Sequence, residues 1–172
     1  MIQMNRHVLS ILVENQAGVL SRVTGLFSRR GYNISSLSVD VTENAERSRI
    51  TVVVFCDDMV IDQIKKQVEK LVDVVRVVEL NPERAVFREL ALIKVSADAD
   101  NRAKIISIVD IFRANVIDVA SETVTVEITG DQSKIAAFVA LMEDYGIKEI
   151  VRTGLTGLCR GNNPMRKHKE VE

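Results

Sequence analysis

The sequence has little of several residue types on which common functions depend. It contains no tryptophan, 4% aromatic residues in all, two histidines and two cysteines among 172 residues. So small an aromatic content argues against a surface that binds nucleic acid by base stacking. With a net charge of −1, the chain as a whole has no positive electrostatic field that would attract nucleic acid. We therefore expect no nucleic-acid partner.

The sequence also lacks the marks of export and of membrane insertion. Cys56 and Cys159 lie far apart in different contexts, which predicts reduced thiols rather than a disulfide framework. The first residues, MIQMNRH, are polar and lack the apolar segment of a signal peptide. No apolar run approaches the roughly 20 residues that a membrane helix needs. We expect a cytoplasmic protein without a membrane partner.

Residues that could form a metal or catalytic centre are scarce and scattered. His7 begins an apolar run and His168 lies in the polar tail, and neither has a cysteine or carboxylate at ligand spacing. The glycines near position 154 do not form a phosphate-binding motif. Asp98 and Asp100 resemble part of a calcium loop, but the loop's glycine and terminal glutamate are missing, so a helix cap is the better interpretation. We expect no catalytic site, metal site or cofactor on this chain.

The chain contains one pattern of strands and helices that occurs twice. From residue 7 to residue 80 the periodicity predicts a strand, a helix that ends at Gly31, a two-stranded hairpin, a second helix and a last strand. After a short linker the same order returns, so that Leu9 aligns with Ala91 and Asn33 with Asn115. The pattern indicates an α+β protein of two ferredoxin-like βαββαβ domains.

The expected boundaries follow from the linker and from the end of the second repeat. We predict a first domain at residues 1–81 and a second at residues 85–161, followed by a polar, flexible tail at residues 162–172. Gly154, Gly157 and Gly161 indicate an irregular end to the second domain.

The turn between the first strand and the first helix is the expected ligand site. A helix N-terminus has unpaired N–H groups and a positive dipole end, both of which favour a carboxylate. Gly18 lets the backbone approach a ligand closely, and the Asn15 amide can both donate and accept, as a free amino acid requires. Asn33, which begins the next strand, offers the same functions. From these residues alone, a plain turn with Asn15 as a local cap remains an alternative.

Several motifs closely resemble those of one family, the regulatory (small) subunit of acetolactate synthase, also called acetohydroxyacid synthase. The resemblance spans about residues 7–161 and includes ENxxG at Glu14–Gly18, LSR at Leu20–Arg22, GLFSRRGYNI at Gly25–Ile34, KLVDV at Lys70–Val74, RELALIKV at Arg88–Val95, RTG at Arg152–Gly154 and GLCRG at Gly157–Gly161.

The resemblance implies that the first domain is an ACT domain, and that ACT domains pair into a homodimer with valine bound between them. The valine site would comprise Asn15, Gly18 and Val19 of one chain with Asn33 and Ile34 of the partner. The catalytic (large) subunit would hold thiamine diphosphate, Mg²⁺ and FAD, and would condense two pyruvates to 2-acetolactate and CO2. This chain would activate that subunit and confer feedback inhibition by valine in the biosynthesis of valine, isoleucine and leucine.

Two other functions are compatible with such a fold. A free-standing ACT-domain amino-acid sensor or transcriptional regulator would need a DNA-binding element, but no basic recognition helix or large basic patch is visible. A small enzyme of the acylphosphatase kind would need a loop with a paired arginine and asparagine, which Asn15 and Asn33 alone do not form. In the second repeat, residues 100–103 replace the glycine-containing turn, so we predict that this half has lost the amino-acid site.

Overall fold

The computed structural model describes residues 4–162. They form two compact units. The first takes up the described residues as far as Val86 and again from Leu155 onward, and the second is Phe87–Gly154. None of the described helices is long and apolar enough to cross a membrane. The expected tail at 162–172 lies outside the described residues from position 163.

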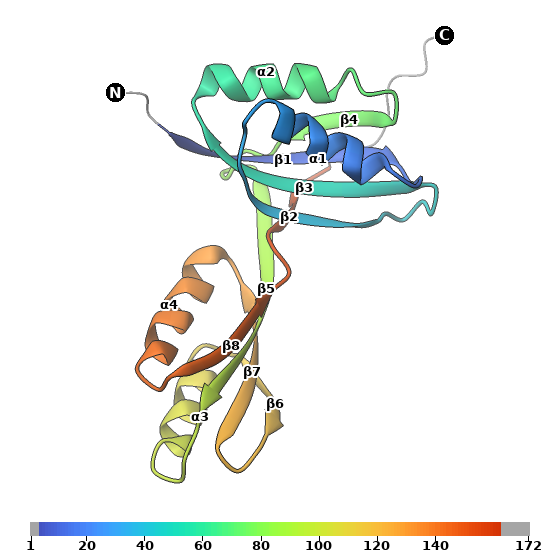
Figure 1. Ribbon diagram of the computed structural model, residues 1–172. Coiled ribbons are helices and arrows are strands. Elements are labelled where there is room, and N and C mark those ends of the chain that lie inside the picture. The colour runs from blue at the N-terminus through green and yellow to red at the C-terminus, as the bar shows by residue number, and fades with distance from the viewer. Residues whose placement is uncertain (1–3, 163–172) are drawn as a thin grey trace. The chain divides into compact units, whose positions relative to one another are not determined.

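The first unit is an antiparallel sheet covered on one face by two helices, α1 and α2 (Figure 1). In chain order its elements are β1 (Asn5–Glu14), α1 (Val19–Arg29), β2 (Ile34–Val41), β3 (Arg47–Cys56), α2 (Asp58–Val68) and β4 (Val74–Glu79). The strand order is β2-β3-β1-β4, so β2 and β4 are the two edges. The predicted βαββαβ order is confirmed for this unit.

The core of the first unit lies between the sheet and the helices. Successive strand side chains point to opposite faces, and the helical apolar residues recur every three or four positions. Leu20 of α1 is 37% exposed and does not belong to this core. The buried members of this core include Leu9, Ile11, Val13, Val19, Val23, Leu26, Phe27, Ile50, Val52, Val54, Ile61, Ile64 and Val68.

The face of this sheet that the helices leave open carries a returning segment of the chain. Ser36 and Ser38 alternate with Leu37, which packs in the core, so both serines point to the open face. The Ser36 hydroxyl accepts a hydrogen bond from the backbone N–H of Leu155 at 2.9 Å, and the Ser38 hydroxyl donates to its carbonyl at 2.9 Å. Leu155 is 1% exposed. Apolar residues on the same face of β1 and β3, such as Val8 and Val53, are also buried.

The structure therefore differs from the expected boundary at the end of the second domain. Residues from Leu155 onward join the first unit, because Ser36 and Ser38 bind the backbone of Leu155 and its side chain is buried there. The segment is also not irregular throughout, since Thr156–Cys159 forms a short strand, β9, that pairs with β5.

The second unit repeats the fold on a smaller scale. Its elements are β5 (Ala85–Ser96), α3 (Arg102–Ile111), β6 (Asn115–Val119), β7 (Thr123–Gly130), α4 (Gln132–Glu143) and β8 (Ile147–Arg152). The strands run in the order β6-β7-β5-β8, which matches the first sheet position by position. Phe112 and Phe138 meet edge to face in its core at 5.3 Å between ring centroids. The prediction of two βαββαβ units of the α+β class is confirmed.

Candidate functional site

The predicted ligand site lies at the end of the first sheet where β1 leads into α1. Glu14, the last residue of β1, pairs with Arg47 at the start of β3, and Val41 at the end of β2 pairs with Ser48. The turn before α1 and the β2–β3 hairpin loop therefore lie at the same end of the sheet.

Asn15 fastens this turn to the hairpin loop. Its Nδ2 donates to the carbonyl of Ala45 at 2.9 Å, and its Oδ1 accepts from the hydroxyl of Ser48 at 3.1 Å. Its backbone N–H donates to the carbonyl of Glu46 at 2.8 Å. The side chain is thus not a local helix cap, and each end of its amide already has one partner. One N–H and one lone pair of the amide remain for a ligand.

Gly18 is the residue that opens α1. It has a φ of +84°, in the left-handed region where residues with a Cβ are strained. No side chain caps this helix end and no acidic residue lies in its first turn, within the described residues. Val19 is buried, and its N–H donates to the carbonyl of Gln16 at 3.3 Å. The N–H groups of Leu20 and Ser21 have no acceptor in the described part of the chain. The two N–H groups can receive a small anion.

Helices α2 and α4 have this position filled by an aspartate. The carboxylate of Asp57 accepts from Val60 N at 2.8 Å before α2, and that of Asp131 accepts from Lys134 N at 2.9 Å before α4. Ahead of α3, the carboxylate of Asp98 accepts from the N–H groups of Asp100 and Asn101 at 3.0 and 2.9 Å. Helices α1 and α3 both begin without a side-chain cap. In the turn before α3, however, a carboxylate already accepts from two N–H groups, whereas none does so in the turn before α1 within the described residues.

Asn33 and Ile34 lie at the opposite end of α1 from Gly18. Because α1 has 11 residues, the two ends are separated by about 16 Å. Asn33 is exposed, and Ile34 is partly buried against the core. One chain therefore brings Asn15, Gly18 and Val19 together but does not bring Asn33 and Ile34 to them. That the last two come from a partner stays a prediction.

The second unit has a different arrangement at the corresponding turn. Arg102, the first residue of α3, donates through Nη2 to the carbonyls of Ala97, Ala120 and Ser121 at 2.6 to 2.9 Å. Its side chain thus occupies three carbonyls around this turn, and the Asp98 carboxylate occupies the N–H groups of Asp100 and Asn101. That this half has lost the amino-acid site stays a prediction.

An ion pair that the sequence did not predict lies beside the Gly18 turn. Arg22 Nε donates to Asp73 Oδ2 at 2.6 Å, joining α1 to the loop before β4. Asp73 lies 51 residues from Arg22, so no local periodicity connects them. Arg22 lies in the LSR motif and Asp73 in the KLVDV motif. The family resemblance of these two motifs was the sequence signal that pointed to the two residues.

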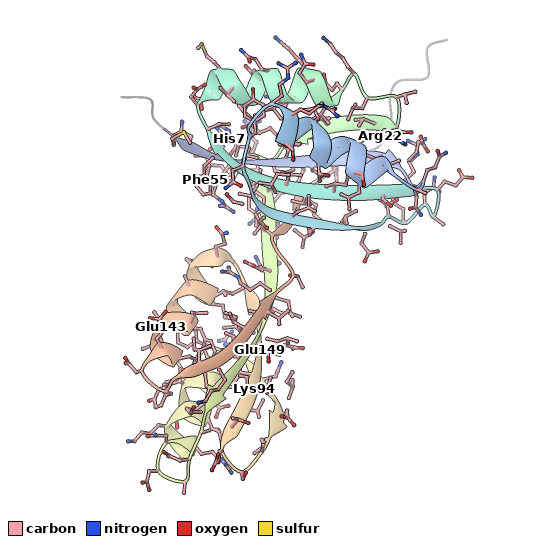
Figure 2. The ribbon with its side chains drawn as sticks, viewed as in Figure 1. His7, Arg22, Phe55, Lys94, Glu143 and Glu149 are labelled. Carbon is pink, nitrogen blue, oxygen red and sulfur yellow. The ribbon has the colours of Figure 1, made fainter. Side chains whose placement is uncertain are left out.

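A polar network at the other end of the sheet was also not predicted. His7 is 8% exposed, and its Nδ1 lies 2.7 Å from Glu79 Oε1. Lys65 donates to Glu79 Oε2 at 2.9 Å and to Asp62 at 2.8 Å. Figure 2 shows His7 and Arg22 at opposite ends of the first unit. Residues that could hold a metal ion do not gather here or elsewhere in the described part of the chain.

Comparisons with known proteins point to one family. Residues 9–76 match the family described as "AHAS small subunit-like ACT domain", and residues 88–161 match "Small subunit of acetolactate synthase". An acetolactate synthase small subunit from Mycobacterium bovis is 52% identical over 155 residues, which cover 90% of this chain and 92% of that protein. A probable acetolactate synthase small subunit from Archaeoglobus fulgidus is 48% identical over 157 residues, 91% of this chain and 98% of that protein.

A solved structure gives the same result. The crystal structure of the acetolactate synthase small subunit from Thermotoga maritima superposes with a TM-score of 0.86 at 44% identity, and the match covers 92% of this chain and 99% of that one.

Proposed function

The chain belongs to the family of acetolactate synthase small subunits, and we propose that it activates the catalytic subunit and makes it sensitive to feedback inhibition by valine. The catalytic (large) subunit then carries the thiamine diphosphate, Mg²⁺ and FAD, and performs the condensation of two pyruvates. In this arrangement the present chain contributes regulation and no catalytic residue.

One observation supports the site most directly: α1 begins at Gly18 with free N–H groups and without a carboxylate of its own. A free amino acid brings the missing carboxylate, and the nearby Asn15 amide has one N–H and one lone pair left for it. The hydrophobic side chain of valine would then contact the apolar surface around Ile34 of a partner.

The sheet provides a way to bring that partner residue to the turn. β2 is an edge strand and runs in the same direction as β1, so its last residue, Val41, lies at the end of the sheet near Gly18. If two chains pair their β2 edges antiparallel about a two-fold axis, the start of one β2 meets the end of the other. Asn33 of the partner would then lie at the Gly18 end. We therefore propose a homodimer through ACT domains with valine between them.

Reconstitution with the catalytic subunit tests this function. We expect the purified chain to raise the acetolactate synthase activity of the catalytic subunit, and valine to lower the activity of the reconstituted enzyme but not that of the catalytic subunit alone. Calorimetric titration of the chain with valine should give heat that saturates at one valine per chain or fewer. Activation without any effect of valine would leave the family assignment intact and contradict the effector assignment.

A further inference from the structure

We propose that Arg22 binds the carboxylate of the amino-acid effector and so selects α-amino acids over analogues that lack the carboxylate. The inference rests on the proposed function, in which an amino acid occupies the turn before α1. It adds a charged side chain to a site that otherwise consists of backbone groups and two asparagine amides.

The position of Arg22 on the helix brings its guanidinium to the turn. Arg22 follows Gly18 by one helical turn, as its N–H donates to the Gly18 carbonyl at 3.0 Å. Long side chains on helices lean toward the N-terminus, over the preceding turn. Its Nη1 accordingly lies 3.3 Å from the point where a Cβ on Gly18 would be. The guanidinium therefore contacts the open face of the turn.

Asp73 holds the Arg22 guanidinium in place through one of its N–H donors and leaves the others free of this contact. A single donor, Nε, bonds to a single carboxylate oxygen at 2.6 Å. The Asp73 side chain is 12% exposed, and the backbone carbonyl of Asp73 accepts from Glu14 N at 2.9 Å, so the anchor is itself attached to the end of β1. Arg22 is 48% exposed, and its two Nη groups have no acceptor in the described part of the chain.

An arginine held in this way suits a carboxylate ligand. A guanidinium has five N–H donors in a planar fork, and hydrogen bonds between charged groups are about twice as strong as neutral ones. Asp73 already offsets part of the charge, but Nη1, which lies beside the turn, remains available. Valine, leucine and isoleucine share the carboxylate, so Arg22 does not distinguish them, whereas an amide in its place lacks the charge that Arg22 recognises.

Calorimetric titration of the full chain with valine and with valinamide, which replaces the carboxylate by an amide, tests the inference. For Arg22→Gln we expect valine affinity to fall on the order of ten-fold or more, while valinamide affinity changes less than about two-fold. Arg22→Lys should give an intermediate loss, since it keeps the charge without the fork. Arg29→Gln, which removes the same charge from the exposed last turn of α1, should leave both affinities unchanged.

The outcomes separate the two proposals. If the unaltered chain binds valine and Arg22→Gln binds it equally well, or loses valine and valinamide affinity to the same extent, the role of Arg22 is wrong while the proposed function stands. If the unaltered chain, alone and with the catalytic subunit, gives no valine response, the proposed function fails and this inference with it. Thermal unfolding of each variant confirms that the fold is intact.

Discussion

Glu79 on β4 and His7 on the neighbouring strand β1 lie 2.7 Å apart, Oε1 to Nδ1, and Lys65 of α2 donates to the second oxygen of the same carboxylate at 2.9 Å. Burial acts to raise the pKa of Glu79, but the hydrogen bonds from Lys65 and His7 outweigh it and lower the pKa below its ordinary 4.5. The network joins strands β1 and β4 to helix α2.

This lowered pKa predicts how the stability of the first unit depends on pH. As the pH falls toward 4.5, the unfolded chain takes up a proton at Glu79 before the folded chain does, so the stabilisation is present above that pH and is lost below it. In urea titrations, the difference in unfolding free energy between the natural chain and Glu79→Gln should shrink as the pH falls below about 4.5. Glu69→Gln, an exposed change after α2, should show no such trend; a Glu79 difference that persists undiminished through acid pH would contradict the prediction.

The two left-handed glycines of the α1 region permit a matched comparison. Gly18→Ala places a Cβ at a φ of +84° and 3.3 Å from Arg22 Nη1, whereas Gly31→Ala has a φ of +70° with nothing within 4 Å. Both should lower the unfolding free energy by about 1–2 kcal/mol, because both strain the backbone. Only Gly18→Ala should also reduce inhibition by valine in the reconstituted enzyme. Equal inhibition in the two variants would argue against a ligand at the Gly18 turn.

Asn33 and its counterpart Asn115 test which half of the chain holds the effector. Asn33→Ala should raise the valine concentration needed for half inhibition at least about ten-fold, since a hydrogen-bonded charged ligand loses a partner. Activation of the catalytic subunit should be largely retained. Asn115 donates to Glu127 at 3.2 Å, and Asn115→Ala should leave inhibition unchanged. Loss of inhibition in Asn115→Ala alone would move the site to the second unit.

The returning segment should contribute measurably to the stability of the first unit. Leu155 is 1% exposed and Leu158 is 56% exposed on the same short segment. Leu155→Ala should lower the unfolding free energy by roughly 2–5 kcal/mol, as for other buried leucines, and Leu158→Ala by no more than about 0.5 kcal/mol. Chemical denaturation followed by circular dichroism measures both. Similar small losses for the two would mean that Leu155 does not stabilise the folded chain.

Much of this structure could be predicted from periodicity. The apolar residues of α1 recur at helical spacing and those of β3 are β-branched, so local sequence determined both elements, and the repeat determined the second unit. The Gly18 turn was also predicted, because a glycine directly before an amphipathic helix indicates a turn from local sequence alone. Periodicity does not decide the exposure of Leu20, which lies at the edge of the apolar stripe of α1 and is 37% exposed.

The features that were missed depend on residues far apart in the chain. His7 and Glu79 are separated by 72 positions and Ser36 and Leu155 by 119, and neither pair follows from a local pattern. β9 is four residues long, includes Gly157 and follows Gly154, so its sequence resembles a loop. The large distance between Asn33 and Gly18 within one chain follows from the length and direction of α1 in the structure, not from a local sequence pattern.

The discontinuity of the first unit has a consequence for the order in which the protein is made on the ribosome. The strands of its sheet are synthesised first, but Leu155, which covers Ser36 and Ser38, follows the whole of Phe87–Gly154. Translation at 5–20 residues per second leaves an interval on the order of seconds between the two. During that interval the nascent chain lacks Leu155, so Ser36 and Ser38 are without the backbone partner that they have in the folded protein.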